Sequence, residues 1–73
     1  MPEHKKLRII IERLAEDWLW RCGVVNISYE KIDGKFYIIF GVRFSEMAKS
    51  TFDYEVYPKN AGGFEIMIKP VRD

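Results

Sequence analysis

The spacing of apolar residues changes once along the chain, at Gly23, and this change sets the fold class. Before Gly23 the apolar residues recur at helical spacing, at Leu7, Ile10, Ile11, Leu14, Ala15, Trp18 and Cys22. Such a stripe predicts one amphipathic helix over residues 2 to about 22. Pro2 suits the first helical turn, and Gly23 suits the left-handed position just after the last turn.

From Val24 onward apolar and polar residues alternate, which predicts half-buried strands. The dipeptide Asp33-Gly34 is typical of a type I′ hairpin turn, because both central residues of that turn take positive φ. Counting outward from the turn predicts three inward-facing pairs, namely Tyr29 with Ile38, Ile27 with Phe40 and Val25 with Val42. Val24 is then expected on the outer face of the sheet.

The second half of the chain predicts another hairpin. Residues 45–50 interrupt the alternation and indicate a connection with at most one helical turn. Alternation resumes over residues 51–57 and again from residue 64, with a turn at 58–63 between them. The expected pairs are Val56 with Ile66, Tyr54 with Ile68 and Asp53 with Lys69, and Pro70 is expected to end the last strand.

These patterns predict a single α+β domain over residues 1–73, with one N-terminal amphipathic helix packed on a four-stranded antiparallel sheet of two hairpins. A chain of 73 residues has room for one core only. Because so small a core gives marginal stability on its own, self-association of the chain is a natural hypothesis.

Because positive and negative charges nearly cancel, the chain has no strong overall electrostatic field. Twelve Lys and Arg residues and eleven Asp and Glu residues leave a formal net charge of +1, so any basic site must be local. Cys22 is the single cysteine, and no apolar run is long enough to span a bilayer. We therefore expect a soluble, cytoplasmic protein without a membrane partner. The lack of Gln and the abundance of Lys, Arg and Glu are typical of proteins that resist heat.

No pattern of reactive residues predicts an enzyme. His4 and Cys22 are the single imidazole and thiol, and 18 residues of predicted helix separate them, which is about 27 Å at about 1.5 Å per residue. A zinc site needs three or four clustered His or Cys ligands, and the chain has too few. The second predicted hairpin has three carboxylates on its outer face, at Asp53, Glu55 and Glu65. We expect these to form a charged face in contact with solvent. We expect no catalytic residue, no metal and no cofactor.

Two sets of residues indicate an interaction surface. The back of the helix, opposite the apolar stripe, has Ile9, Arg13 and Trp20, and Trp and Arg are frequent anchors of interfaces. The outer sheet face is more apolar than a solvated face requires, with Tyr37, Ile39, Arg43, Tyr57, Met67 and Lys69. The sequence thus predicts a non-enzymatic protein-interaction or assembly module, with a homodimer as one form. The surface used would be the outer sheet face, a free strand edge or the line of Ile9 and Trp20.

A small nucleic-acid-binding protein is the alternative hypothesis. Aromatic and basic side chains on an open sheet can stack unpaired bases and contact phosphates, and the residues for this are Tyr37, Arg43, Tyr57 and Lys69. The basic start of the helix would add phosphate contacts from Lys5, Lys6 and Arg8. The carboxylates expected on the same sheet face argue against this alternative. A third hypothesis, an enzyme whose site is completed between two subunits, requires a dimer.

Overall fold

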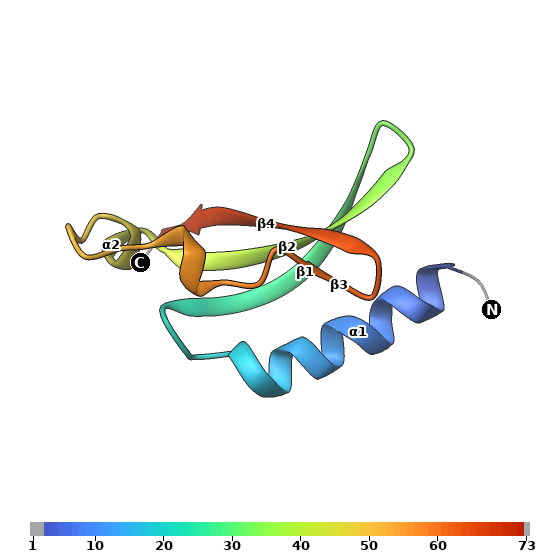
Figure 1. The fold of residues 1–73 in the computed structure, drawn as a ribbon, viewed down its shortest axis with the longest axis horizontal. Helices are drawn as coiled ribbons and strands as arrows, with labels where there is room; N and C mark the ends of the chain where they lie inside the picture. The colour runs from blue at the N-terminus through green and yellow to red at the C-terminus, as the bar shows by residue number, and fades with distance from the viewer. Residues whose placement is uncertain (1–2, 73) are drawn as a thin grey trace.

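The computed structural model describes residues 3–72 and has the predicted α+β class, with an N-terminal helix and a four-stranded sheet. The elements in chain order are the α-helix α1 (Glu3–Trp18), the strands β1 (Val24–Ile32) and β2 (Lys35–Arg43), the short helix α2 (Phe44–Met47), the 3-10 turn η1 (Tyr54–Val56), and the strands β3 (Asn60–Ala61) and β4 (Phe64–Val71). Helix α1 lies along one face of the sheet (Figure 1).

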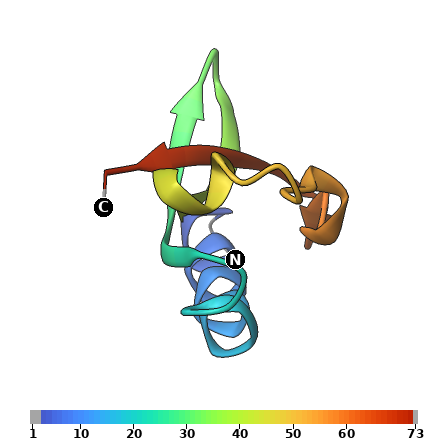
Figure 2. The ribbon, with the colours of Figure 1, turned by 90° about the vertical axis from the view of Figure 1, so that its left-hand side faces the viewer.

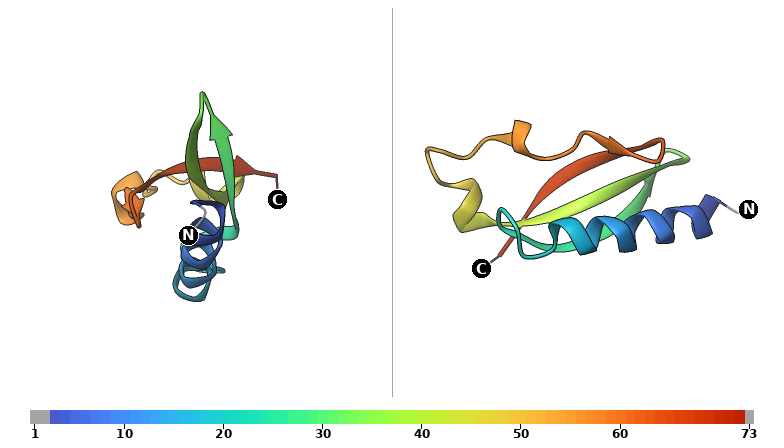
Figure 3. Two further views of the ribbon diagram at one scale, coloured as in Figure 1. Left: turned by 90° about the vertical axis from the view of Figure 1, so that its right-hand side faces the viewer. Right: turned by 60° about the horizontal axis from the view of Figure 1, so that its bottom comes forward.

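The sheet is mixed, and the prediction of a purely antiparallel sheet is wrong. The strand order is β1-β2-β4-β3. Strand β2 is antiparallel to β1, and β3 is antiparallel to β4, but β2 and β4 are parallel. Parallel neighbours need a crossover connection, which the chain between α2 and β3 supplies. Figure 3 (right) shows this connection running alongside β4, while α1 runs alongside β1.

Helix α1 ends at Trp18 rather than near Cys22. Leu19 still donates its N–H to the Ala15 carbonyl, but Trp20 then takes a positive φ of 68°. The Trp20 N–H bonds the Val24 carbonyl at 2.8 Å, which ties the end of the helix to the start of β1. The left-handed position that stops the helix is therefore Trp20, and Cys22 and Gly23 follow as two more. The expected role of Pro2 lies outside the described residues.

The first hairpin is confirmed. Asp33 and Gly34 both have positive φ, 50° and 80°, as a type I′ turn requires. The pairs of Tyr29 with Ile38 and of Ile27 with Phe40 are present. The tip of this hairpin projects away from the rest of the molecule, on the side opposite α1 (Figure 2).

The third predicted pair of this hairpin, Val25 with Val42, is wrong. A bulge between Val24 and Asn26 pairs Val24 with Val42 instead, and Val24 is fully buried. Because a bulge inserts one extra residue into a strand, it reverses which side chains face inward beyond it. Val24 therefore belongs to the core and not to the outer face.

The second hairpin differs most from the prediction. Residues 51–57 are not a strand, because the Asp53 side chain accepts the Glu55 N–H at 2.9 Å and starts η1. Only β3 pairs with β4, through Asn60 with Glu65 and Ala61 with Phe64. The predicted pairs of Val56, Tyr54 and Asp53 with β4 are wrong, since these residues form η1 and its N-cap, and β4 pairs with β2 and β3 instead. Strand β4 also continues through Pro70 to Val71.

The core lies between α1 and the sheet and is closed by the connection before β3. Trp18 of α1 packs against Phe40 of β2, with ring centroids 6.0 Å apart, and against Tyr57 of the connection at 5.8 Å. Phe52 also packs on Tyr57 at 5.9 Å. The buried cluster consists of Leu7, Val24, Ile38, Phe40, Val42, Tyr57 and Phe64. One face of the sheet is thus filled, and the opposite face is left without a layer.

Candidate interaction surface

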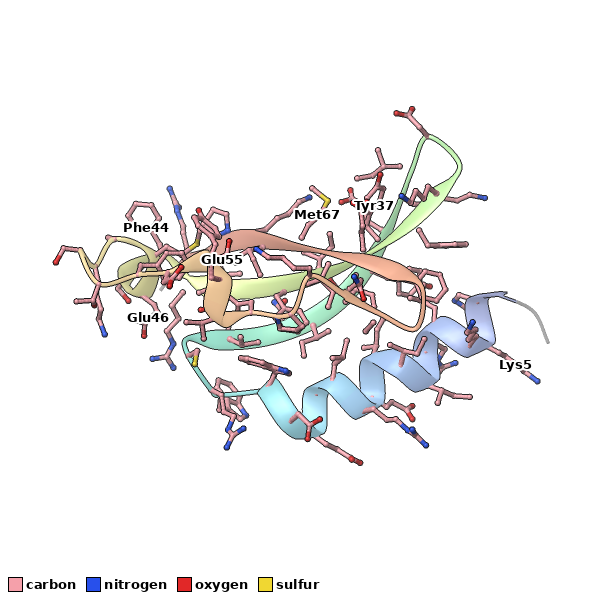
Figure 4. All side chains as sticks on the ribbon, in the orientation of Figure 1. Lys5, Tyr37, Phe44, Glu46, Glu55 and Met67 are labelled. Atoms are coloured by element: carbon pink, nitrogen blue, oxygen red, sulfur yellow. The ribbon has the colours of Figure 1, made fainter. Side chains whose placement is uncertain are left out.

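The outer face is the side of the sheet away from α1. Strand alternation places Tyr37, Ile39 and Arg43 of β2 on this face, and the parallel register sets Met67 and Lys69 of β4 beside them. Tyr37 and Met67 point away from the helix layer in Figure 4. Neither α1 nor the connection before β3 covers the outer face, because both pack against the inner side of the sheet. The predicted positions of these five residues on one face are confirmed.

Ile39 is the centre of the outer face. It lies between Ser28 of β1 and Met67 of β4, and only 7% of it is exposed. Glu30 of β1 and Lys69 of β4 form an ion pair of 2.9 Å that spans β2 next to Ile39. Ile39 is therefore covered largely by its own neighbours, and the half-buried side chains of Tyr37 and Met67 supply the apolar surface that the face offers to a partner.

A groove of about 550 Å³ continues the outer face at the end of the sheet. It is lined by Phe44 and Ser45 after β2 and by Pro70, Val71 and Arg72 at the end of β4. Phe44 is 62% exposed although aromatic side chains gain most from burial. Sequence alternation missed Phe44, because it continues the inward series of Ile38, Phe40 and Val42. Strand β2 ends at Arg43, so Phe44 leaves the sheet and turns outward.

The helix residues proposed for interaction do not join this face. Ile9 is 46% exposed and Trp20 is 70% exposed, and Arg13 is exposed as well. However, α1 ends before Trp20, so the helical line predicted between Ile9 and Trp20 is broken. Ile9 and Arg13 lie on the helix layer, on the other side of the sheet from Met67.

Tyr57 was expected on the outer face, and that placement is wrong. Its ring is buried in the core against Trp18 and Phe40. Its Oη donates a hydrogen bond to the Cys22 carbonyl at 2.5 Å. This bond joins the connection before β3 to the loop after α1. Tyr57 therefore stabilises the fold and is not available for stacking against a partner.

A Tyr57→Phe variant should lose both stability and part of its alkaline sensitivity. Burial raises the pKa of Tyr57 above 10.0, and the charges of Cys22 and Glu46 raise it further. The folded state therefore keeps this proton to higher pH than the unfolded chain, so the stabilisation is full below about pH 10 and is lost as the pH rises through the folded pKa. Loss of the hydrogen bond should cost about 1–2 kcal/mol at neutral pH.

Urea unfolding from pH 8 upward measures both effects. Above about pH 10 the wild type should lose stability faster than the variant, because only the wild type has this titration. Parallel curves for the two proteins would contradict the assignment of the raised pKa to Tyr57.

The basic residues proposed for phosphate are separate from the outer face. Lys5, Lys6 and Arg8 are exposed in the first turns of α1, and Figure 4 shows Lys5 at the helix end, away from Tyr37 and Met67. On the sheet, Lys69 pairs with Glu30 at 2.9 Å. The two halves of the predicted nucleic-acid surface thus lie on opposite layers of the molecule.

The residues considered for catalysis do not come together in one site. His4 Nε2 is 2.6 Å from the Tyr29 hydroxyl, and Cys22 is exposed. The three carboxylates were expected on one strand face, but Asp53 and Glu55 belong to the η1 turn, whereas Glu65 is on β4. Glu55 pairs with Lys59 at 3.1 Å and Glu65 with Lys35 at 3.4 Å. Among residues 3–72, no group of three or more His, Cys, Asp or Glu could hold a metal ion.

Comparison with known proteins gives no relative: no protein-family model, no curated protein and no solved structure matches the chain. Within the described residues, no helix is both long and apolar enough to cross a membrane. The interaction surface therefore has to be interpreted from its own residues.

Proposed function

We propose that this chain is a non-enzymatic assembly module that forms a homodimer through the outer face. One observation supports this most strongly: the sheet has a layer on one side only, while the open side has Ile39 at its centre with Tyr37 and Met67 around it. A second copy of the chain would supply the missing layer. Packing two such sheets face to face adds a second core to a domain whose own core is small.

The charge pattern favours a second copy over nucleic acid. The outer-face lysines Lys35 and Lys69 are each paired with a glutamate of the same chain, Glu65 and Glu30, so of the outer-face cations named above Arg43 alone adds a net charge. A phosphate backbone gains most from unpaired cations, whereas an apolar face whose lysines are paired suits a copy of itself. The free thiol of Cys22 suits a reducing compartment, which agrees with the cytoplasmic location predicted from sequence.

A Met67→Lys variant tests the homodimer. A lysine at this position would bring two like charges into the apolar centre of the interface, which should weaken dimerisation by about thirtyfold or more, equivalent to about 2 kcal/mol. Sedimentation equilibrium of wild type and variant over a range of concentrations measures this change. Ile9→Lys, at an exposed position on the opposite layer, is the matched control and should leave the dimer unchanged.

The same experiment separates the alternatives. A wild type that stays monomeric at high micromolar concentration would contradict the homodimer. Absorbance at 260 and 280 nm on the same sample reports bound nucleic acid. A monomer with nucleic acid that salt removes would favour the nucleic-acid hypothesis, with Arg43 as the first residue to replace.

A further inference from the structure

The two edges of the sheet differ in their free backbone groups. The two-residue turn makes Ile32 and Lys35 a hydrogen-bonded pair, so every second residue back from Ile32 also bonds β2. The residues between them, Ile27, Tyr29 and Lys31, point their N–H and C=O groups away from the sheet. Within residues 3–72, these groups have no backbone partner outside the sheet. Strand β1 therefore has a row of free N–H and C=O groups to which another strand could form hydrogen bonds.

The opposite edge has fewer free backbone groups. Strand β3 pairs with the start of β4, and the Ile66 N–H bonds the Lys59 carbonyl at 3.0 Å. Because Ile66 faces this edge, Ile68 and Pro70 face it too. Pro70 has no N–H to offer, which is a common way to protect an edge strand. An added strand would therefore find more free backbone groups at β1 than at the edge of β4.

The open edge of β1 borders a groove. The groove measures about 320 Å³ and is lined by Arg8, Ile11 and Glu12 of α1 and by Ile27, Ser28 and Tyr29 of β1. Its floor is the strand edge, and its wall is the side of the helix. Of the strands, β1 is the one that α1 approaches most closely, as Figure 3 also shows.

We infer that this groove binds an extended peptide segment of another protein, which adds to β1 as a further strand. Main-chain hydrogen bonds to an edge strand give such binding its affinity, and pockets for alternate side chains give its specificity. Here Ile11 and Ile27 provide an apolar contact for an inward-facing side chain of the peptide. This surface lies on the α1 side of the sheet, so it is independent of the homodimer proposed for the outer face.

Steric limits favour a peptide over a second copy of the chain. Neighbouring strands lie about 4.8 Å apart, whereas packed helices need about 8–10 Å between their axes. Because α1 lies closest to β1, a second copy that paired its own β1 here would bring its helix too close to the first. A segment without a helix avoids this clash.

The charges on the wall of the groove define the peptide further. His4 contacts Tyr29 and the loop after the helix joins Val24, so α1 and β1 run in opposite directions. Arg8 thus lies toward the Tyr29 end of the groove and Glu12 toward the start of β1. An antiparallel peptide should therefore have an acidic residue before its apolar residue and a basic residue after it.

The probe is a short capped peptide of alternating valine and threonine with a glutamate near its N-terminus and a lysine near its C-terminus. Titration into the ¹⁵N-labelled full chain should shift the amide signals of Ile27, Tyr29 and Lys31 and slow their hydrogen exchange. The same peptide with N-methyl groups on alternate amides has the same side chains but cannot complete the ladder, so it should bind far more weakly.

A charge exchange on the groove wall supplies the decisive comparison. The double variant Arg8→Glu with Glu12→Arg should bind the original peptide about fivefold more weakly and prefer a peptide with its two charges exchanged. Arg13→Glu with Glu16→Arg, on the exposed back of α1, should change neither preference. The inference is overturned by no binding at millimolar peptide, by equal binding of the N-methylated peptide, or by signal shifts confined to Ile39 and Met67.

Discussion

Replacing Phe40 by alanine should remove a large share of the protein's free energy of unfolding. Phe40 is fully buried on the central strand β2, in ring contact with Trp18 and Tyr57. Its loss removes contacts to the helix layer and to the connection before β3 together, and Phe→Ala changes in a core cost about 3–5 kcal/mol. At about 0.05–0.15 kcal/mol per residue, a chain of this size has about 4–11 kcal/mol in total.

Urea unfolding followed by circular dichroism measures the loss. Ile9→Ala provides the matched control, because Ile9 lies on the solvent side of α1 and its truncation should change stability by less than about 0.5 kcal/mol. If Phe40→Ala were no worse than Ile9→Ala, the core would not lie between α1 and the sheet as described.

Replacing Gly62 by valine should cost the second-largest amount. Gly62 has a φ of +57° in the turn between β3 and β4, and a Cβ atom there would lie 2.1 Å from Ile10 Cδ1. The left-handed conformation costs an L-residue about 1–2 kcal/mol, and forcing apart the contact with α1 costs about 1–3 kcal/mol more. The sum is a loss of about 2–5 kcal/mol.

A variant at Gly34 separates the conformational cost from the cost of the contact with α1. This glycine has a similar φ of +80° in the first hairpin turn, but no atom lies within 4 Å of the position of its Cβ. Gly34→Val should therefore show the conformational cost alone, about 1–2 kcal/mol. The difference between the two variants in the free energy of unfolding measures the contact of the β3–β4 turn with α1. Equal losses would show that this contact contributes nothing.

Features with a local cause were predictable from the sequence. The apolar spacing of α1 and the Asp33-Gly34 turn each depend on a few neighbouring residues, and both are present. The bulge was not predictable, because Val24 and Val25 are equally apolar and alternation cannot choose between them. The loop after α1 makes the choice, through the bond of the Trp20 N–H to the Val24 carbonyl.

The second half of the chain was not predictable because β4 pairs with β2, a strand that is distant in the sequence. Residues 51–57 alternate like a strand, but β4 pairs with the central strand β2 on one side and with β3 on the other, and the connection serves as the crossover. The same limit applies to the interaction surface. Alternation placed Tyr37 and Met67 on the outer face correctly, yet the ion pair of Glu30 with Lys69 across β2 depends on the strand order.

The parallel pairing of β2 with β4 also sets the order in which the chain can fold during synthesis. The hairpin of β1 and β2 has local contacts and can form as soon as it leaves the ribosome, whereas β4 is made last. Until then the second edge of β2 is unpaired beside the apolar side chains of Ile38, Phe40 and Val42. Pairing of β4 with β2 therefore ends the period in which this sheet is most exposed to aggregation.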